Sequence, residues 1–98
     1  MSLRALLHNP RIPARARNAF AQAIVSTSAE QVLWREVAAR HTLDAFGVVG
    51  QDEREAIAEA RTWFDTCYDD VHLLFEYAGV DPVPVIEELD KFLKEQKS

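Results

Sequence analysis

The chain is short of the residues on which several classes of protein depend. Its 98 residues include one cysteine, three glycines and four prolines. Because Cys67 is the lone cysteine, no intrachain disulfide can form, which favours a reducing, cytoplasmic environment. Gly47, Gly50 and Gly79 do not have the spacing of a P-loop or of a dinucleotide-binding motif.

Long apolar runs are missing as well. The N-terminal run Ala5-Leu6-Leu7 is too short for a signal peptide, and no run approaches the roughly 20 residues of a membrane span. We therefore expect an intracellular protein that makes no contact with a membrane. The hydrophobic fraction of 48% is ordinary for a globular protein, and the length suits one domain over residues 1–98.

Helical patterns fill most of the chain, and no stretch alternates apolar and polar residues for long enough to predict a strand. The predicted fold class is all-α, a compact bundle of four to six short helices. Proline and capping residues predict where the helices start, whereas glycine predicts where they end. The predicted starts are Ser2, Pro13, either Thr27 or Ser28, Asp52, either Asp69 or Asp70, and Asp81-Pro82; Gly47 and Gly79 are predicted ends.

The third of these helices is the hardest to orient from its pattern. Spacings of three and four predict that one face is apolar and packs on the core. That face would carry Leu33, Trp34, Val37, Ala38, His41 and Ala45. The polar residues Gln31, Arg35, Arg40 and Asp44 would then lie on the other sides of the helix.

Charge is divided unequally along the chain. Residues 1–29 contain four arginines and no acid, namely Arg4, Arg11, Arg15 and Arg17. Residues 51–98 contain 13 acids against 5 basic residues, so this part carries a charge of −8 within a total of −5. One interpretation is a basic arm over residues 1–12 beside an acidic body; the other is that the two halves attract each other within the fold.

Residues that could carry out catalysis or hold a metal ion are sparse. Cys67 and His72 do not form a known nucleophile pattern, and His41 with Asp44 lacks the further ligands of a metal site. The acids Asp65, Asp69 and Asp70 have neither the spacing nor the glycine of a calcium loop, so helix capping explains them better. We expect no enzyme activity, no cofactor and no metal.

The most informative segment lies near the C-terminus. A short helix, a turn at Gly79 and a second helix with Val85 six residues beyond that glycine resemble a helix-turn-helix. Phe75 and Glu88 depart from its usual pattern, which has a small and an apolar residue there. The second helix carries the acids Glu87, Glu88 and Asp90, and DNA would repel it.

Three segments also resemble a loose group of small proteins from tailed phages and prophages. The segments are Leu33-Trp34-Arg35, Glu55-Ala56 through Trp63-Phe64, and Glu76-x-Ala78-Gly79-x-Asp81-Pro82-x-x-Val85. Most members of the group have no known activity. The resemblance implies a phage-related origin and a helical fold, and it implies no reaction.

Two functions follow as hypotheses. The first is a phage-type helical adaptor or inhibitor that binds a basic protein partner, such as a host or phage nucleic-acid-binding protein, through an acidic C-terminal surface and an aromatic anchor. Its site would consist of Glu87, Glu88, Asp90, Trp34 and Trp63. The alternative is a nucleic-acid-associated regulator or DNA-packaging component that uses Arg4, Arg11, Arg15 and Arg17, with self-association multiplying the charge.

Overall fold

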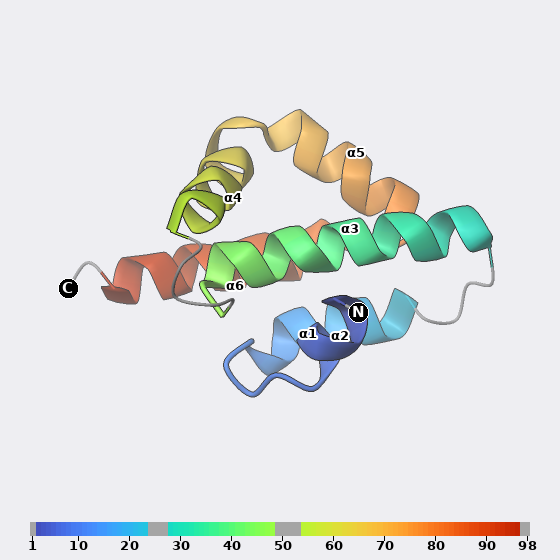
Figure 1. Cartoon of the computed structure of the whole chain (residues 1–98), viewed down its shortest axis with the longest axis horizontal. Helices are drawn as coiled ribbons and strands as arrows, with labels where there is room; N and C mark the ends of the chain where they lie inside the picture. Colours follow the sequence, from blue (N-terminus) through green and yellow to red (C-terminus); the bar gives the residue numbers. More distant parts are fainter. Residues whose placement is uncertain (1, 24–27, 49–53, 97–98) are drawn as a thin grey trace.

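A computed structural model describes residues 2–23, 28–48 and 54–96. These ranges contain six helices and no strand, so the predicted all-α fold class is confirmed (Figure 1). The helices are α1 (Ser2–Leu7), α2 (Ala14–Ala23), α3 (Ala29–Phe46), α4 (Arg54–Thr66), α5 (Tyr68–Ala78) and α6 (Pro82–Gln96). None of these helices has the length and hydropathy that crossing a membrane requires.

Helix α3 is the centre of the bundle. It packs against α1, α4, α5 and α6, while α2 packs mainly against α6. In Figure 1, α4 and α5 lie on one side of α3, α1 and α2 lie on the other, and α6 runs behind. The radius of gyration of 12.5 Å agrees with the value of about 12.6 Å expected for a compact chain of this length.

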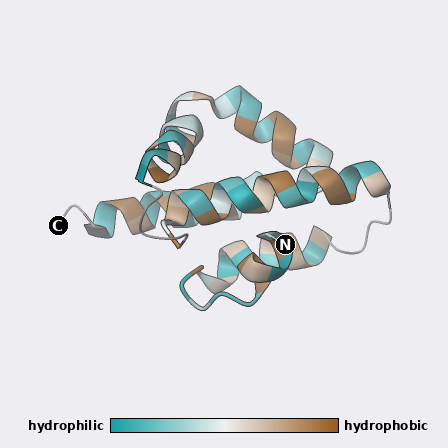
Figure 2. Cartoon of the chain, viewed as in Figure 1, coloured by the Kyte–Doolittle hydropathy of each residue, from teal (hydrophilic) through white to brown (hydrophobic). Residues whose placement is uncertain are grey.

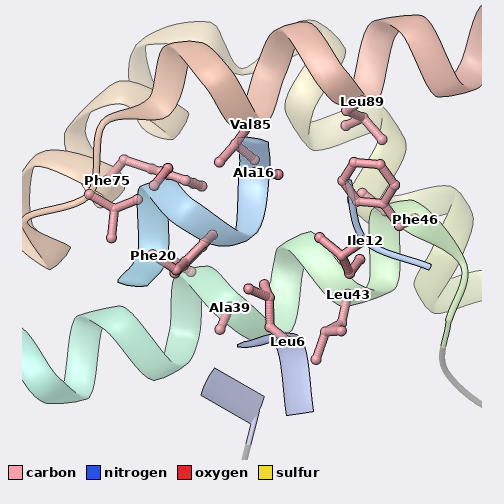
Figure 3. Packing of buried hydrophobic residues seen from close by; sticks show 14 of the residues in the cluster. Leu6, Ile12, Ala16, Phe20, Ala39, Leu43, Phe46, Phe75, Val85 and Leu89 are labelled. Atoms are coloured by element: carbon pink, nitrogen blue, oxygen red, sulfur yellow. The ribbon is translucent and has the colours of Figure 1, made fainter. Parts of the chain in front are cut away.

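The core joins side chains from α1 to α6, and Figure 3 labels members of it from α1, α2, α3, α5 and α6. Phe75 of α5 is fully buried and makes edge contacts with Phe20 at 5.8 Å and with Phe64 at 6.1 Å between ring centroids. A large buried ring therefore occupies the position at which a helix-turn-helix usually has a small residue. Val85 of α6 is also fully buried, at the position where the sequence pattern expects an apolar residue.

Four predicted helix boundaries are confirmed by their hydrogen bonds. The side chain of Ser28 accepts a bond from the Gln31 N–H, and that of Asp81 accepts one from the Val83 N–H. Gly47 and Gly79 end α3 and α5 in the left-handed conformation, with φ angles of +71° and +72°. The alternative cap Thr27 and the predicted start at Asp52 lie outside the described residues.

The start of α5 differs from the prediction. The helix begins at Tyr68, and Cys67 occupies the capping position without a side-chain hydrogen bond. Asp69 and Asp70 lie within the first turn instead, where the helix dipole favours negative charge without any capping bond.

Residues 2–12 belong to the folded body, which differs from the suggested basic arm. Leu6 of α1 and Ile12 in the following turn are both fully buried. The backbone N–H groups of Ser2 and Leu3 donate to the carboxylate of Glu36 at 2.9 and 3.2 Å. These bonds satisfy donors at the start of α1 that have no partner within the helix.

The predicted face of α3 is wrong at four residues, Leu33, Trp34, Arg35 and Asp44. Leu33 is 62% exposed, whereas Arg35 is only 2% exposed and points into the bundle. The guanidinium of Arg35 donates through Nε to the carbonyl oxygen of Ala78 at 3.1 Å, at the end of α5. Asp44 is buried as well, and its carboxylate pairs with Arg40 at 3.4 Å.

Candidate functional site

The outer side of α5, together with Trp34 of α3, forms the surface that we call the α5 face. It has an apolar centre, Leu73 and Tyr77, which are 48% and 53% exposed and lie one helical turn apart. Exposed carboxylates surround this centre, and α5 contains no lysine or arginine. The surrounding acids are Asp69, Asp70 and Glu76.

Trp34 adds a second aromatic ring to this face. It is 39% exposed, and its ring stacks on that of Tyr77 with centroids 5.8 Å apart and planes 30° apart. The two rings come from different helices, α3 and α5, whose sequences are coloured by hydropathy in Figure 2. Because Trp34 precedes Arg35, the bond from Arg35 to the Ala78 carbonyl ties the same turn of α3 to the end of α5 that bears Tyr77.

The acids predicted on α6 divide between two directions. Glu87 and Glu88 turn toward α2, where Arg15 lies 2.7 Å from the first and 4.0 Å from the second. The predicted acidic site and the predicted basic site therefore meet in one molecule. Asp90 turns the other way and lines a groove between α6 and α4.

That groove has an apolar floor and charges of both signs along its edges. The lining residues are Arg61, Thr62, Phe64, Asp65, Ile86, Leu89, Asp90, Leu93 and Lys94. Arg61 is held by a hydrogen bond from its Nε to the carbonyl oxygen of Ala45 at 2.9 Å. Mixed charge at the edges gives the groove no clear preference for a basic or an acidic partner.

The two predicted tryptophan anchors have different surroundings. Trp63 is half-buried and packs against Phe64 at 5.0 Å and against His41 at 4.7 Å between ring centroids. Burial lowers the pKa of His41; Asp44 opposes this effect and Arg40 reinforces it. Trp63 is thus mainly a packing residue, whereas Trp34 presents its ring beside an exposed tyrosine.

The four arginines do not share one environment. Arg4 is exposed and lines a groove between α1 and α3, whereas Arg15 pairs with α6. Arg11 is exposed in the turn before α2, and its backbone N–H donates to the side chain of Asn9 at 2.9 Å. Arg17 is half-buried, and its Nε is enclosed without a hydrogen-bond partner among the described residues.

Within residues 2–23, 28–48 and 54–96, no group of three or more histidine, cysteine, aspartate and glutamate side chains is placed to hold a metal ion. Cys67 is half-buried beside the hydroxyl of Thr66, with the two atoms 3.7 Å apart. His72 points its Nδ1 toward the carbonyl oxygen of Tyr68, 3.1 Å away. The described contacts therefore include no pairing of Cys67 with a base.

Sequence reasoning missed most of the α5 face. Neither Leu73 nor Tyr77 was singled out from the sequence, and Asp69 and Asp70 were assigned to capping. A signal was present, because Leu73 and Tyr77 fall off the spacing of the buried stripe formed by Val71, Phe75 and Ala78. Apolar residues off that stripe, beside three acids and no basic residue, indicate an exposed apolar surface.

Comparisons of the chain with protein-family models, with curated proteins and with solved structures gave no match.

Proposed function

We propose that this chain is a non-enzymatic helical binding module, of the adaptor or inhibitor kind, that captures a basic segment of a protein partner on the α5 face. The observation that carries the proposal is the exposed stack of Trp34 on Tyr77 within an acidic surface. Exposed apolar surfaces of this kind are typical of interfaces, where tryptophan and tyrosine are enriched among the few residues that dominate the binding energy.

The chemistry of the face selects the partner. Asp69, Asp70 and Glu76 are exposed around Leu73 and Tyr77, so a bound helix would meet an apolar centre inside an acidic rim. An amphipathic helix with leucine-like residues on one side and lysine or arginine at its edges complements both features. The aromatic faces of the stacked rings also attract cations.

This proposal moves the binding surface from α6 to α5. Glu87 and Glu88 are engaged by Arg15, so a partner would have to compete with a contact inside the molecule. The acids of α5 have no such cation in the described contacts. The acidic, protein-directed character of the original hypothesis is kept, with Trp34 as its aromatic anchor.

The nucleic-acid alternative has less support. Of its four arginines, Arg15 is paired with acids and Arg17 is partly enclosed, which leaves Arg4 and Arg11 exposed. Phosphate binding gains strength from many simultaneous cationic contacts. The phage-related origin expected from the sequence likewise draws no support from the comparisons.

The two tryptophans allow a direct test. In the Trp63→Phe variant, Trp34 is the lone tryptophan and reports on the α5 face; in Trp34→Phe, Trp63 reports on a site away from it. A synthetic amphipathic helix with leucines and lysines is titrated into each variant. We expect a saturable change in the fluorescence emission of Trp34 and little change in that of Trp63. The affinity derived from the Trp34 signal should fall as the salt concentration rises.

Controls separate specific binding from general attraction. A peptide with glutamate in place of every lysine should not bind. The Glu76→Lys substitution should lower the affinity for the basic peptide about tenfold or more. The same charge reversal at Asp90, in the α4–α6 groove, should leave the affinity nearly unchanged. Equal losses from Glu76→Lys and Asp90→Lys, or no Trp34 response, would contradict the assignment.

A further inference from the structure

The groove between α1 and α3 is a second apolar surface, distinct from the α5 face. Three apolar and three polar side chains line it, namely Leu3, Leu7, Val32, Arg4, His8 and Glu36. The carboxylate of Glu36 already accepts bonds from the backbone N–H groups of Ser2 and Leu3. Both carboxylate oxygens of Glu36 are thus engaged at the start of α1, whereas Arg4 is exposed at the rim without an ion pair among the described contacts.

Next to this groove stands the most exposed large apolar side chain among the described residues. Leu33 is 62% exposed and directly follows Val32 on α3. Successive residues of a helix point about 100° apart, so Leu33 projects beside the groove and cannot enter it from its own chain. Glu30 is exposed one turn before Leu33, which places an acid beside this apolar side chain.

We propose that the groove takes Leu33 of a second copy of this chain, in a symmetric dimer. In a two-fold dimer each copy presents the same surface, so each Leu33 fills the groove of the other copy. The charges agree with this pairing: Arg4 at the groove rim meets Glu30 of the partner subunit beside the entering leucine. A groove with an unpaired arginine at its rim thus fits a projecting leucine that has an acid beside it.

The dimer would change how the molecule binds. The residues of the α5 face, Trp34, Leu73 and Tyr77 among them, do not line the groove, so each dimer carries two α5 faces. A partner with two basic segments would bind both faces, and linked contacts strengthen binding without any new chemistry. The dimer itself does not depend on the function proposed for the α5 face.

The test is the mass of the protein in solution as a function of concentration. Sedimentation or light scattering should show a mass that rises from 11.1 kDa toward twice that value. Leu33→Glu should remain at 11.1 kDa at every concentration. The matched control is Leu73→Glu, at an exposed apolar position on α5, which should dimerise like the wild type; thermal unfolding verifies that both variants fold.

Charge reversal then tests the orientation of the two copies. Arg4→Glu and Glu30→Arg should each weaken the dimer about tenfold or more, and the double variant should regain most of that loss. A mass of 11.1 kDa at all concentrations would overturn the proposal. Self-association that persists in Leu33→Glu, or that is lost in Leu73→Glu, would also overturn it. Failure of the Arg4→Glu/Glu30→Arg double variant to regain dimerisation would do the same.

Discussion

Arg35 links the two helices that carry the α5 face. Its side chain is buried between them, and its Nε–H satisfies the Ala78 carbonyl in the last turn of α5, where backbone acceptors lack helical partners. A positive charge at that end of the helix is also favoured by the helix dipole. Arg35 thus contributes both a hydrogen bond and a favourable charge interaction to the contact between α3 and α5.

Replacing Arg35 with alanine should therefore destabilise the fold. The unpaired Ala78 carbonyl alone costs about 1–3 kcal/mol of the free energy of unfolding, measured by urea denaturation. Arg54→Ala on α4 is the matched control, because Arg54 is exposed and substitutions at exposed positions usually change stability by less than about 0.5 kcal/mol. Equal costs for the two variants would contradict the role given to Arg35.

His41 should make stability depend on pH. Burial lowers the pKa of His41 below its usual value of about 6.5, so the unfolded chain binds this proton more tightly than the folded chain does. The folded state is therefore fully favoured above about pH 6.5 and loses stability as the pH falls through that value toward the folded pKa.

The His41→Gln variant isolates this contribution from that of the carboxyl groups. Unfolding free energies are measured for both proteins at about pH 7.5 and about pH 5.5. We expect the wild type to lose more stability than His41→Gln over this interval. A larger loss in the variant would mean that Asp44 outweighs burial and that the pKa of His41 is raised.

At the scale of helices, a glycine ends each of the two helices that carry the α5 face, Gly47 for α3 and Gly79 for α5. Gly79 has a φ of +72°, and a Cβ there would meet Gln31 Nε2 at an ordinary 3.5 Å, so backbone conformation and not crowding sets the cost of substitution. Gly79→Ala should lower stability by about 1–2 kcal/mol in thermal or urea unfolding. Gly47→Ala, at a φ of +71°, should cost a similar amount.

Gly79→Val should cost more than Gly79→Ala, because a β-branched residue is especially poor at positive φ. If both variants at Gly79 were as stable as the wild type, α5 would have to end elsewhere, and the stack of Trp34 on Tyr77 would lose its structural basis.

Helix ends were predictable from the sequence because their signals are local. Ser28, Gly47, Gly79 and Asp81 each act within a few residues of their own position, through capping bonds or a left-handed backbone. The start of α5 was missed because aspartate is favourable both at the capping position and in the first turn, so Asp69 and Asp70 do not show which of the two places they occupy.

The orientation of α3 was not predictable in the same way. This helix contacts α1 and α5 on different sides as well as α4 and α6, so its apolar residues are spread around its circumference. Burial of Arg35 depends on an acceptor 43 residues away, at Ala78, which no local spacing reveals. The α5 face escaped prediction for the same reason, since it requires knowledge of which side of each helix the core covers.

For the whole molecule, the distribution of charge now has a physical reading. Arg15 of the acid-free N-terminal part lies against Glu87 and Glu88 of the acidic C-terminal part, where α2 packs on α6. Both Arg15 and Glu87 side chains are 54% exposed, so water and salt screen the pair and its worth stays below about 1 kcal/mol. Its main effect is to remove charge from both predicted sites.

This arrangement predicts weak binding to nucleic acid. The net charge is −5, and Arg4 and Arg11 are the exposed arginines of the N-terminal part that have no described ion pair. Fluorescence anisotropy with labelled duplex and single-stranded DNA should therefore show little binding even at low salt. If binding does occur, the number of phosphate contacts follows from its dependence on salt, because each contact on duplex DNA contributes about −0.9 to the slope of log binding constant against log salt concentration. A steep slope that is abolished by Arg4→Glu and Arg11→Glu together would support the nucleic-acid function, and peptide binding that is unchanged in Asp69→Lys would at the same time contradict the role of the α5 face. If no binding to DNA is detected, the acidic, aromatic α5 face remains the surface through which this molecule acts.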